Sequence, residues 1–247
     1  MQRIYRVFEG DREPNGLAMD DVADALGSGG LALVPTETVY GVAVAVEAFS
    51  DAVPQDEPAR SPRYPQDPSA SVNGCPVPAL GTGYRRIFTL KRRELTQTVA
   101  WLVADERALD SFGVDVPPAA RAVARAFWPG ALTIVVKAAP CVPAFMQAAD
   151  GTVALRASAS PVIQALVRRV GPLACTSSNT HGNPAPASFA EVEPRILAGV
   201  DVAIDAGETP CRDASTIVSF QRGGLEILRQ GALPAADIER VVAGTGV

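Results

Sequence analysis

The stretch LALVPTETVYGVAVAV, residues 31–46, begins and ends as an apolar strand but carries seven residues of another kind in its middle. Pro35 lacks an amide proton and therefore ends strand pairing, whereas Gly41 allows another backbone to approach closely. Two interpretations follow from these residues alone. The interruption is either a solvated bulge in a strand or one wall of a binding site.

The polar residues of the interruption alternate along the chain. Thr36 and Thr38 stand two positions apart, so an extended backbone places both hydroxyls on one face of the strand. Glu37 then points to the opposite face, and Tyr40 joins the threonines. We therefore take Thr36, Thr38 and Tyr40 as candidate binding residues.

The composition describes an ordinary globular protein. Of the 247 residues, 47% are hydrophobic and 20% are charged, and the net charge of −5 does not indicate a nucleic-acid or membrane partner. No apolar run reaches the roughly 18 residues of a membrane span, and residues 1–16 lack the apolar segment of a signal peptide. We expect a soluble, cytoplasmic protein without a membrane partner.

The cysteines do not form a recognisable set of ligands. Cys75, Cys141, Cys175 and Cys211 are widely scattered without a CxxC motif, and His181 is the single histidine. This pattern favours reduced thiols in the cytosol, and no metal site is expected from protein side chains.

Apolar runs of strand type alternate with helical patterns along most of the chain, which predicts an α/β fold. Helices are expected over residues 17–30, 84–93, 117–130, 160–171 and 188–198. The last two carry capping signals, which are Ser160 before Pro161 and the capping box SFAE at 188–191. Strands are expected over residues 31–46, 98–105, 131–138, 151–157, 172–179, 201–207, 215–220 and 225–231.

Residues 51–82 do not share this periodicity. The segment is rich in proline, serine and charge, and about 30 residues without structure is long for a loop inside a compact domain. It is either a functional flap or a disordered insertion. Because the runs on both sides belong to one predicted sheet, we expect a single domain over residues 1–247 with a flexible insertion at about 51–82.

A basic cluster, KRR at residues 91–93, ends the helix predicted over 84–93. Cations at a helix end suit the helix dipole, so a solvated helix end is one interpretation. The other is that Lys91 and Arg93 present two cations to one polyphosphate, through charge-assisted hydrogen bonds of roughly 1.5–3 kcal/mol each.

Further polar groups stand at strand ends, where ligands usually bind in open α/β sheets. In CTSSNTHGNP, residues 175–184, Ser177 and Asn179 alternate as the two threonines do. Arg156 ends an apolar strand, and a buried arginine needs a carboxylate or phosphate nearby. Ser215 opens another strand, and with it the candidate set consists of hydroxyls, amides and cations.

The motifs that are missing restrict the chemistry. The sequence has no GxxxxGK[ST] loop, no GxGxxG after a strand, no Cys–His pair and no GxSxG. A site of hydroxyls, amides and cations suits the binding and alignment of anions, with proximity and electrostatics supplying the rate.

Several separated motifs, in this order, resemble those of the YrdC-like threonylcarbamoyl-AMP synthases. They span roughly residues 17–234 apart from the insertion, and they are VPTETVYGV, Lys91-x-Arg93, FWPGALTIVV, VALR, TSSN with Ser177-x-Asn179, STIV and LRQGAL. The resemblance implies a single twisted mixed β-sheet flanked by helices around a deep concave cleft. We expect the short form of the family, without its extra carboxy-terminal domain.

The resemblance also implies a reaction. Members of the family condense L-threonine, bicarbonate and ATP into threonylcarbamoyl-AMP and pyrophosphate, which makes them nucleotidyltransferases. The product supplies the N6-threonylcarbamoyl group of adenosine 37 of tRNA through a separate transfer partner. Direct contact with RNA is a further expectation.

Each candidate residue receives a role from the resemblance. The residues implied to hold the nucleotide phosphates, together with Mg²⁺ carried by those phosphates, are Lys91, Arg93, Ser177 and Asn179. The residues implied to line the threonine and carbamate side are Thr36, Thr38, Tyr40 and Arg156, with Ser215 closing the pocket. The candidate catalytic residues are Lys91, Arg93 and Thr38.

The chain departs from the family pattern at a few positions. Arg92 stands where a small residue is usual, ELTQTVAW replaces a proline-containing segment after Arg93, and Ala157-Ser158 replaces x-Pro after Arg156. Two other functions therefore stay open. One is a related enzyme that forms carbamoyl- or acyl-adenylates or transfers a carbamoyl group, and the other is a non-catalytic homologue that binds double-stranded RNA or tRNA.

Overall fold

The structure is a computed structural model, and it describes residues 3–7, 15–50, 64–221 and 223–245. The strands are β1 (Arg3–Arg6), β2 (Ala32–Pro35), β3 (Tyr40–Ala45), β4 (Gln66–Val72), β5 (Cys75–Pro78), β6 (Ala100–Leu102), β7 (Gly113–Val114), β8 (Leu132–Ala138), β9 (Thr152–Arg156), β10 (Leu173–Ser177), β11 (Val202–Asp205), β12 (Thr216–Ser219) and β13 (Glu226–Arg229). The α-helices are α1 (Gly16–Gly27), α2 (Gly83–Lys91), α3 (Ala108–Phe112), α4 (Pro118–Phe127), α5 (Pro161–Val170), α6 (Pro194–Ala198) and α7 (Ala235–Ala243). Short 3-10 turns are η1 (Val46–Ala48), η2 (Ala144–Met146) and η3 (Phe189–Glu191).

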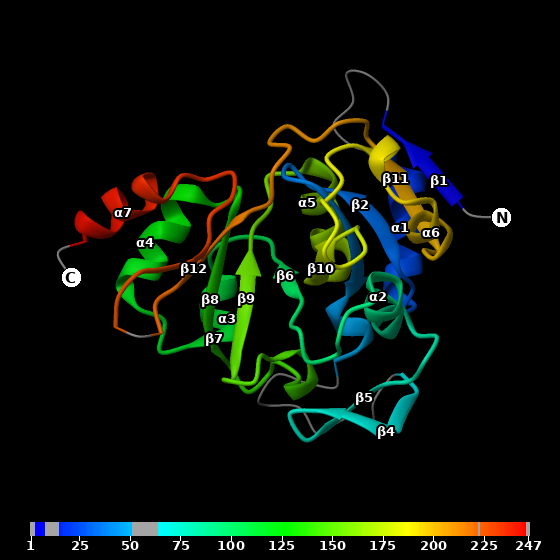
Figure 1. Cartoon of the computed structure of the whole chain (residues 1–247), viewed down its shortest axis with the longest axis horizontal. Helices are drawn as coiled ribbons and strands as arrows, with labels where there is room; N and C mark the ends of the chain where they lie inside the picture. Colours follow the sequence, from blue (N-terminus) through cyan, green and yellow to red (C-terminus); the bar gives the residue numbers. More distant parts are fainter. Residues whose placement is uncertain (1–2, 8–14, 51–63, 222, 246–247) are drawn as a thin grey trace.

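Eleven strands of the described chain form one sheet in the order β1-β11-β2-β3-β10-β6-β9-β8-β12-β13, with β7 beside β8. The sheet is mixed, because β6 runs parallel to β9 and β8 parallel to β12, whereas β2, β3 and β10 alternate in direction. Helices pack on this sheet (Figure 1), so the predicted mixed sheet flanked by helices is confirmed. Within the described ranges, the helices are too short or too polar to cross a membrane.

The opening stretch forms a hairpin rather than one interrupted strand. β2 and β3 pair antiparallel from Ala32 opposite Ala43 to Pro35 opposite Tyr40, and residues 36–39 make the turn between them. The prediction of an extended backbone through the threonines is therefore wrong. Pro35 ends β2 as expected, but the chain reverses there instead of continuing in one direction.

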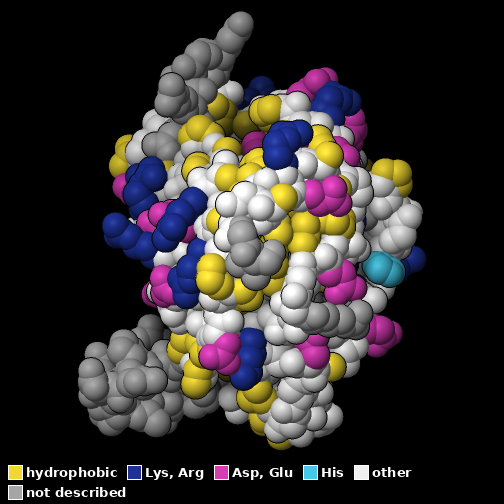
Figure 2. All heavy atoms as spheres, turned by 90° about the vertical axis from the view of Figure 1, so that its left-hand side faces the viewer, with side chains coloured by type: hydrophobic (Ala, Val, Ile, Leu, Met, Phe, Trp, Pro, Cys, Tyr) yellow, Lys and Arg dark blue, Asp and Glu magenta, His cyan; other side chains and the backbone are white. Residues whose placement is uncertain are grey.

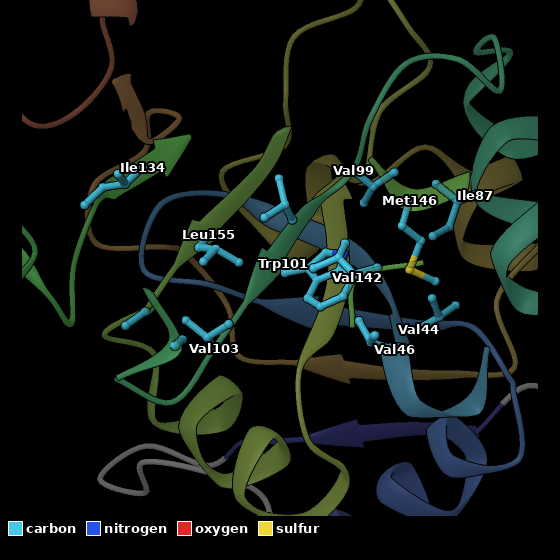
Figure 3. Packing of buried hydrophobic residues seen from close by; sticks show 14 of the residues in the cluster. Val44, Val46, Ile87, Val99, Trp101, Val103, Ile134, Val142, Met146 and Leu155 are labelled. Atoms are coloured by element: carbon cyan, nitrogen blue, oxygen red, sulfur yellow. The ribbon is translucent and has the colours of Figure 1, made fainter. Parts of the chain in front are cut away.

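Two hydrophobic cores lie on the two faces of the sheet. Side chains alternate along β3, so Val42 and Val44 enter one core while Ala43 and Ala45 enter the other. Helices α1 and α5 pack together on the Ala43 side, and α4 packs with α7 on the other side. Figure 3 shows the larger core around Trp101, which is 1% exposed. Each fully buried aliphatic side chain contributes about 1.5–3 kcal/mol, so the two cores hold the strands in register.

The segment predicted as an unstructured insertion contains a separate two-stranded sheet. Its described part, residues 64–82, includes the β4–β5 hairpin, whose turn residues Asn73 and Gly74 have positive φ values of 52° and 74°. Tight hairpin turns favour this backbone conformation. The side-chain amide of Asn73 donates to the carbonyl oxygens of Ala144, which begins η2, and of Gln147, which follows it, each at 2.9 Å, and this attaches the hairpin to the main body. The rest of the predicted insertion, residues 51–63, lies outside the described residues.

The capping box predicted at residues 188–191 does not form, and the helix expected over 188–198 is divided into two pieces. Ser188 makes no side-chain cap, and Pro194 begins α6 after the separate turn η3. Proline lacks an amide proton, which favours the first position of a new helix over the interior of a longer one. Ser160 precedes α5 as predicted, but its hydroxyl donates to the Pro35 carbonyl at 2.9 Å instead of capping the helix.

Helix α2 positions the basic cluster, and a close backbone contact fixes where this helix begins. The Gly83 amide donates to the Gly29 carbonyl at 3.1 Å, and the Thr82 hydroxyl caps the helix. A Cβ atom at Gly83 would lie 2.5 Å from the Gly29 oxygen and 2.8 Å from the Gly30 carbonyl carbon. No side chain fits between α2 and the glycine turn before β2.

We expect Gly83→Ala to destabilise the protein by about 1–3 kcal/mol, although helix propensity alone favours alanine by about 1 kcal/mol. Gly27→Ala is the matched control, because a Cβ atom at that position of α1 meets nothing within 4 Å. Urea denaturation midpoints measure both changes. An unchanged or higher midpoint for Gly83→Ala would contradict the contact between α2 and the glycine turn.

Candidate functional site

A cavity of about 550 Å³ lies on the same face of the sheet as the core under α1 and α5. Leu102 and Cys175 belong both to that core and to the cavity floor. The floor is hollow because Gly41, Ala100 and Ala154 carry little or no side chain. A Cβ atom at Gly41 would lie 2.5 Å from the Cys175 sulfur. The strands themselves form the floor, so strand register sets the positions of the polar groups around it.

The cavity collects eight of the nine site residues predicted from the sequence. The eight are Thr36, Thr38, Tyr40, Arg93, Arg156, Ser177, Asn179 and Ser215. They come from the β2–β3 turn, the chain after α2, and the ends of β9, β10 and β12. The ninth residue, Lys91, does not line the cavity. Among the described lining residues there is no aspartate or glutamate.

The threonine turn is held by its own hydrogen bonds. The Thr36 hydroxyl accepts from the amides of Thr38 and Val39, each at 3.1 Å, and donates to the Val39 carbonyl at 2.6 Å. The Thr36 hydroxyl therefore makes its hydrogen bonds within the turn and not to a ligand. The Thr38 hydroxyl lies 2.8 Å from the Thr36 oxygen, and because Thr36 gives its proton to Val39, Thr38 donates to Thr36 and keeps its own oxygen free to accept. Thr38 is therefore the better placed of the two to contact a ligand.

Tyr40 directs its hydroxyl away from the threonines. The hydroxyl donates to the Gly207 carbonyl at 3.1 Å and accepts from the Ala206 amide at 2.9 Å. Burial raises the pKa of Tyr40 to about 12, so the phenol is neutral at physiological pH. Tyr40 thus anchors the chain that leaves β11, and it contributes to the cavity wall without a free hydroxyl.

Arg156 has the anionic partner that its burial requires. Its Nη2 atom lies 2.7 Å from Oε1 of Glu37, and the two side chains are 8% and 10% exposed. The Ser158 hydroxyl donates to the other oxygen of Glu37, and Arg156 Nε donates to the Gly130 carbonyl at 3.1 Å. Burial opposes ionisation of Glu37, but the Arg156 charge and the Ser158 hydrogen bond outweigh it and lower the pKa of the carboxyl. Glu37 was not predicted as a site residue, although it is the carboxylate of the hydroxyl-rich turn.

Arg93 enters the cavity without a carboxylate partner among the described residues. Its Nε donates to Oε1 of Gln97 at 3.0 Å, and Nη1 donates to the Thr176 hydroxyl at 3.1 Å. Nη2 donates to the Thr98 carbonyl at 2.5 Å. Burial lowers the pKa of Arg93, because the charged form loses solvation and no anion replaces it. A bound anion would replace the favourable interactions with water that the Arg93 guanidinium loses on burial.

Arg229 also lines the cavity and was not predicted, although it lies in the LRQGAL motif. Its Nε and Nη2 donate to the Ser215 carbonyl at 3.1 and 2.8 Å. The Ser215 hydroxyl in turn lies 2.8 Å from the Thr133 hydroxyl. Burial and then the charge of Arg156 lower the pKa of Arg229. The charge of Asp213 acts in the opposite direction on the pKa of Arg229, although no ion pair joins Arg229 to a carboxylate among the described residues.

Lys91 lies behind the cavity rather than in it. The residue is 3% exposed, and its Nζ donates to the Asn179 carbonyl at 2.8 Å, to Oδ1 of Asn179 at 3.1 Å and to the Ser177 carbonyl. Burial, and after it the charge of Arg93, lowers the pKa of Lys91 to about 8. Lys91 therefore fixes the chain that carries Ser177 and Asn179, and direct contact with phosphate stays a prediction.

The segment next to the cavity mouth is the one that joins β11 to β12. Figure 1 shows this segment across the top of the view, with the β4–β5 hairpin at the lower edge. The Cys211 amide of the joining segment donates to the Glu37 carbonyl at 2.9 Å. None of the described residues 64–82 lines the cavity.

A larger hollow of about 660 Å³ lies between the glycine turn at 27–30, η1 and the start of α2. Its two arginines are paired, Arg86 with Asp201 and Arg169 with Asp20. The smaller cavity is the better candidate site because it holds cations without carboxylate partners. In the part of the chain that the structure describes, no cluster of histidine, cysteine or acidic residues is placed to hold a metal ion.

Known proteins are similar to this chain over most of its length. A family model described as "Telomere recombination", for Sua5, YciO and YrdC, matches residues 81–231. A Mycobacterium tuberculosis protein provisionally named as a threonylcarbamoyl-AMP synthase is 31% identical over 232 residues, which cover 94% of this chain and 92% of that protein. The threonylcarbamoyl-AMP synthase of Pyrococcus abyssi is 30% identical over 177 residues, or 71% of this chain and 52% of that protein.

Solved structures extend the likeness to three dimensions. The crystal structure of P. abyssi Sua5 complexed with L-threonine has a TM-score of 0.76 and 25% identity, and it covers 98% of this chain. This chain spans 60% of the length of that Sua5 chain. The crystal structure of E. coli YciO has a TM-score of 0.72 and covers 94% of this chain and 96% of its own, and at 18% identity it shows a common fold.

Ser178 stands between two cavity residues, yet its side chain is fully buried and its hydroxyl has no hydrogen-bond partner in the described chain. Such a hydroxyl costs about 1–3 kcal/mol, so we expect Ser178→Ala to raise the free energy of unfolding by about 1 kcal/mol, measured by urea denaturation. Ser158→Ala is the matched control, because that equally buried hydroxyl holds Glu37 and its loss should destabilise the protein. Equal destabilisation by both changes would show that Ser178 has a partner.

Proposed function

Because the chain belongs to the Sua5/YciO/YrdC family, we propose that it condenses L-threonine, bicarbonate and ATP into threonylcarbamoyl-AMP and pyrophosphate. The P. abyssi relative carries the name of this synthase, and a solved relative is a complex with L-threonine. The observation on this chain that carries the proposal is the cavity, which three arginines enter and whose described lining has no carboxylate.

The proposed reaction brings an amino-acid carboxylate, a carbamate and a triphosphate into one place. The threonine amine attacks the carbon of CO₂ derived from bicarbonate and loses a proton, which gives the carbamate. A carbamate oxygen then attacks the α-phosphorus in line, and pyrophosphate leaves with the electrons of the broken bond. No covalent bond to the protein is needed, so alignment and charge stabilisation account for the rate.

We assign the nucleotide phosphates to the β10 side of the cavity, which is lined by Arg93, Ser177 and Asn179, with Arg229 as a further cation on the β12 side. Neither Arg93 nor Arg229 forms an ion pair with a carboxylate among the described residues, and the charge of Asp213 only partly offsets the lowering of the pKa of Arg229, so both cations are available to a polyanion. Lys91 supports this end from behind. The described lining does not fit a resident Mg²⁺ because it lacks acidic ligands, and we propose that the ion enters as part of the MgATP substrate.

We assign threonine and its carbamate to the end of the cavity at Arg156 and Thr38. Glu37 compensates the charge of Arg156, which suits the recognition of one carboxylate better than that of a triphosphate. The Thr38 hydroxyl faces the same space, while Thr36 and Tyr40 hold the wall in place. Ser215, whose carbonyl accepts a hydrogen bond from Arg229, closes the cavity on the β12 side.

The proposal includes the route of the product. Threonylcarbamoyl-AMP is a mixed anhydride that a separate transfer enzyme uses to modify adenosine 37 of tRNA, and direct contact of this chain with RNA would need a basic surface. On the face in Figure 2, lysine and arginine side chains gather on one side with acidic side chains among them. A mixed surface of this kind gives less affinity for a phosphate backbone than a continuous basic one.

Release of pyrophosphate by the purified protein tests the proposal. With ATP, Mg²⁺ and bicarbonate, release should depend on L-threonine and yield threonylcarbamoyl-AMP, identified by mass. Serine, other amino acids and carbamoyl phosphate are the comparison substrates. Release that is independent of threonine, or that is faster with a comparison substrate, would favour a related adenylate-forming or carbamoyl-transfer enzyme. Tight, salt-sensitive tRNA binding without turnover would favour a non-catalytic RNA-binding protein.

We expect Lys91→Ala to lower kcat/KM for ATP by about two orders of magnitude, or ~2.7 kcal/mol of transition-state stabilisation. The change removes a cation beside Arg93 and three hydrogen bonds to the chain that carries Ser177 and Asn179. Arg92→Ala is the matched control, because Arg92 is an exposed cation of the same cluster. A rate near that of the wild type for Lys91→Ala would remove Lys91 from the site.

The lowered pKa of Lys91 gives this prediction a pH dependence. The ammonium form prevails below a pKa of about 8 and is lost as the pH rises through that value. Since the charged form supports phosphate binding, kcat/KM for ATP should fall above about pH 8. Lys91→Arg should move this alkaline limb to higher pH, and an unmoved limb would assign it to another group.

A further inference from the structure

The arginines of the cavity differ in the charge of the groups that hold them. Arg156 lies 2.7 Å from the Glu37 carboxylate, so its charge is compensated inside the protein. Arg93 is held at Nε by the side-chain oxygen of Gln97 at 3.0 Å, which is neutral. An arginine nitrogen only donates, so the amide oxygen of Gln97 and not its nitrogen must face it.

Gln97 reaches Arg93 because the chain turns back after α2. The backbone amide of Gln97 donates to the Glu94 carbonyl at 3.1 Å, which places the half-buried Gln97 side chain beside Arg93. Thr176 and Thr98 each take one N–H from a terminal nitrogen. Neutral acceptors thus use three of the five N–H groups, and one on each terminal nitrogen remains for an anion.

We infer that Gln97 is a positioning residue for Arg93: it fixes the guanidinium toward the nucleotide phosphates and, being neutral, leaves its charge uncompensated. The inference rests on the proposed function, in which Arg93 meets ATP. Gln97 stands in ELTQTVAW, where this chain departs from the family pattern, so the role follows from this chain's own geometry. A carboxylate at this position would keep the hydrogen bond and cancel the charge.

The other charged groups near Arg93 agree with this role. Lys91 is a second cation, whose pKa is lowered in part by Arg93. The Glu94 side chain is exposed and makes no ion pair with Arg93 in the described chain. With no acidic residue in the described lining, Gln97 is placed at the one contact where a glutamate of the same shape would neutralise Arg93.

Isothermal titration with MgATP and with inorganic tripolyphosphate tests the inference on the intact protein and three variants. Gln97→Glu retains an acceptor on Arg93 Nε but adds a negative charge, whereas Gln97→Ala removes the acceptor. Gln66→Glu is the matched control, because Gln66 is exposed on β4, which contributes nothing to the cavity lining. Melting temperatures and the KM for threonine are measured alongside.

We expect Gln97→Glu to weaken both ligands about tenfold and Gln97→Ala about threefold, with Gln66→Glu unchanged. The KM for threonine should change less than twofold in every variant. A purely structural role predicts the reverse order, since glutamate would preserve the contact and bind as the wild type does. That result, or a wild type that binds neither ligand, overturns the inference. The expected order of affinities without threonine-dependent turnover would instead defeat the proposed function and leave the role of Gln97 standing.

Discussion

The buried ion pair between Glu37 and Arg156 is the constraint on which the rest of the site depends. It joins the β2–β3 turn to the end of β9 across two intervening strands, β10 and β6. A buried charge that loses its partner costs about 3–5 kcal/mol, so the turn and the strand hold each other in place. The Cys211 amide binds the Glu37 carbonyl and the Ser160 hydroxyl binds the Pro35 carbonyl, so two further segments are attached to the same turn.

The sequence predicted which residues belong to the site better than it predicted where their side chains point. Polar residues at strand ends converge because the sheet brings those ends together, and eight of nine predicted residues line one cavity. The sequence alone does not show which of the two cations, Lys91 or Arg93, enters the cavity. Arg92 between them adopts a left-handed conformation, with φ of 51°. The chain turns there, which leaves Lys91 behind β10 and Arg93 inside the cavity. An extended backbone predicts that Glu37 points to the face opposite the threonines. The chain turns instead, and Glu37 pairs with Arg156.

The parts of the fold that were not predicted lack the patterns on which sequence reasoning depends. β4 exposes most of its residues, and the short β5 contains Pro76 and Pro78 as β4 contains Pro68, so neither an apolar period nor an uninterrupted strand marks them. The strand expected over 98–105 is reduced to β6, because only three residues pair with its neighbours β10 and β9. The helices predicted from strong amphipathic patterns, such as α4 and α5, are present within a few residues of their expected ends.

The arginines of the cavity differ in how far other groups of the protein compensate their charges, and the proposed chemistry uses this difference. A single carboxylate is recognised by the geometry of its hydrogen bonds. The Arg156 guanidinium offers that geometry, and because Glu37 compensates its charge, it adds little net positive potential. A triphosphate that loses pyrophosphate gains charge at the leaving group, and this charge is stabilised best by cations that form no ion pair with a carboxylate of the protein. Arg93 and Arg229 are held by amides, hydroxyls and carbonyls, which fix their geometry without cancelling their charge. Cations fixed in advance need little reorganisation when charge develops, and that condition makes electrostatic stabilisation large.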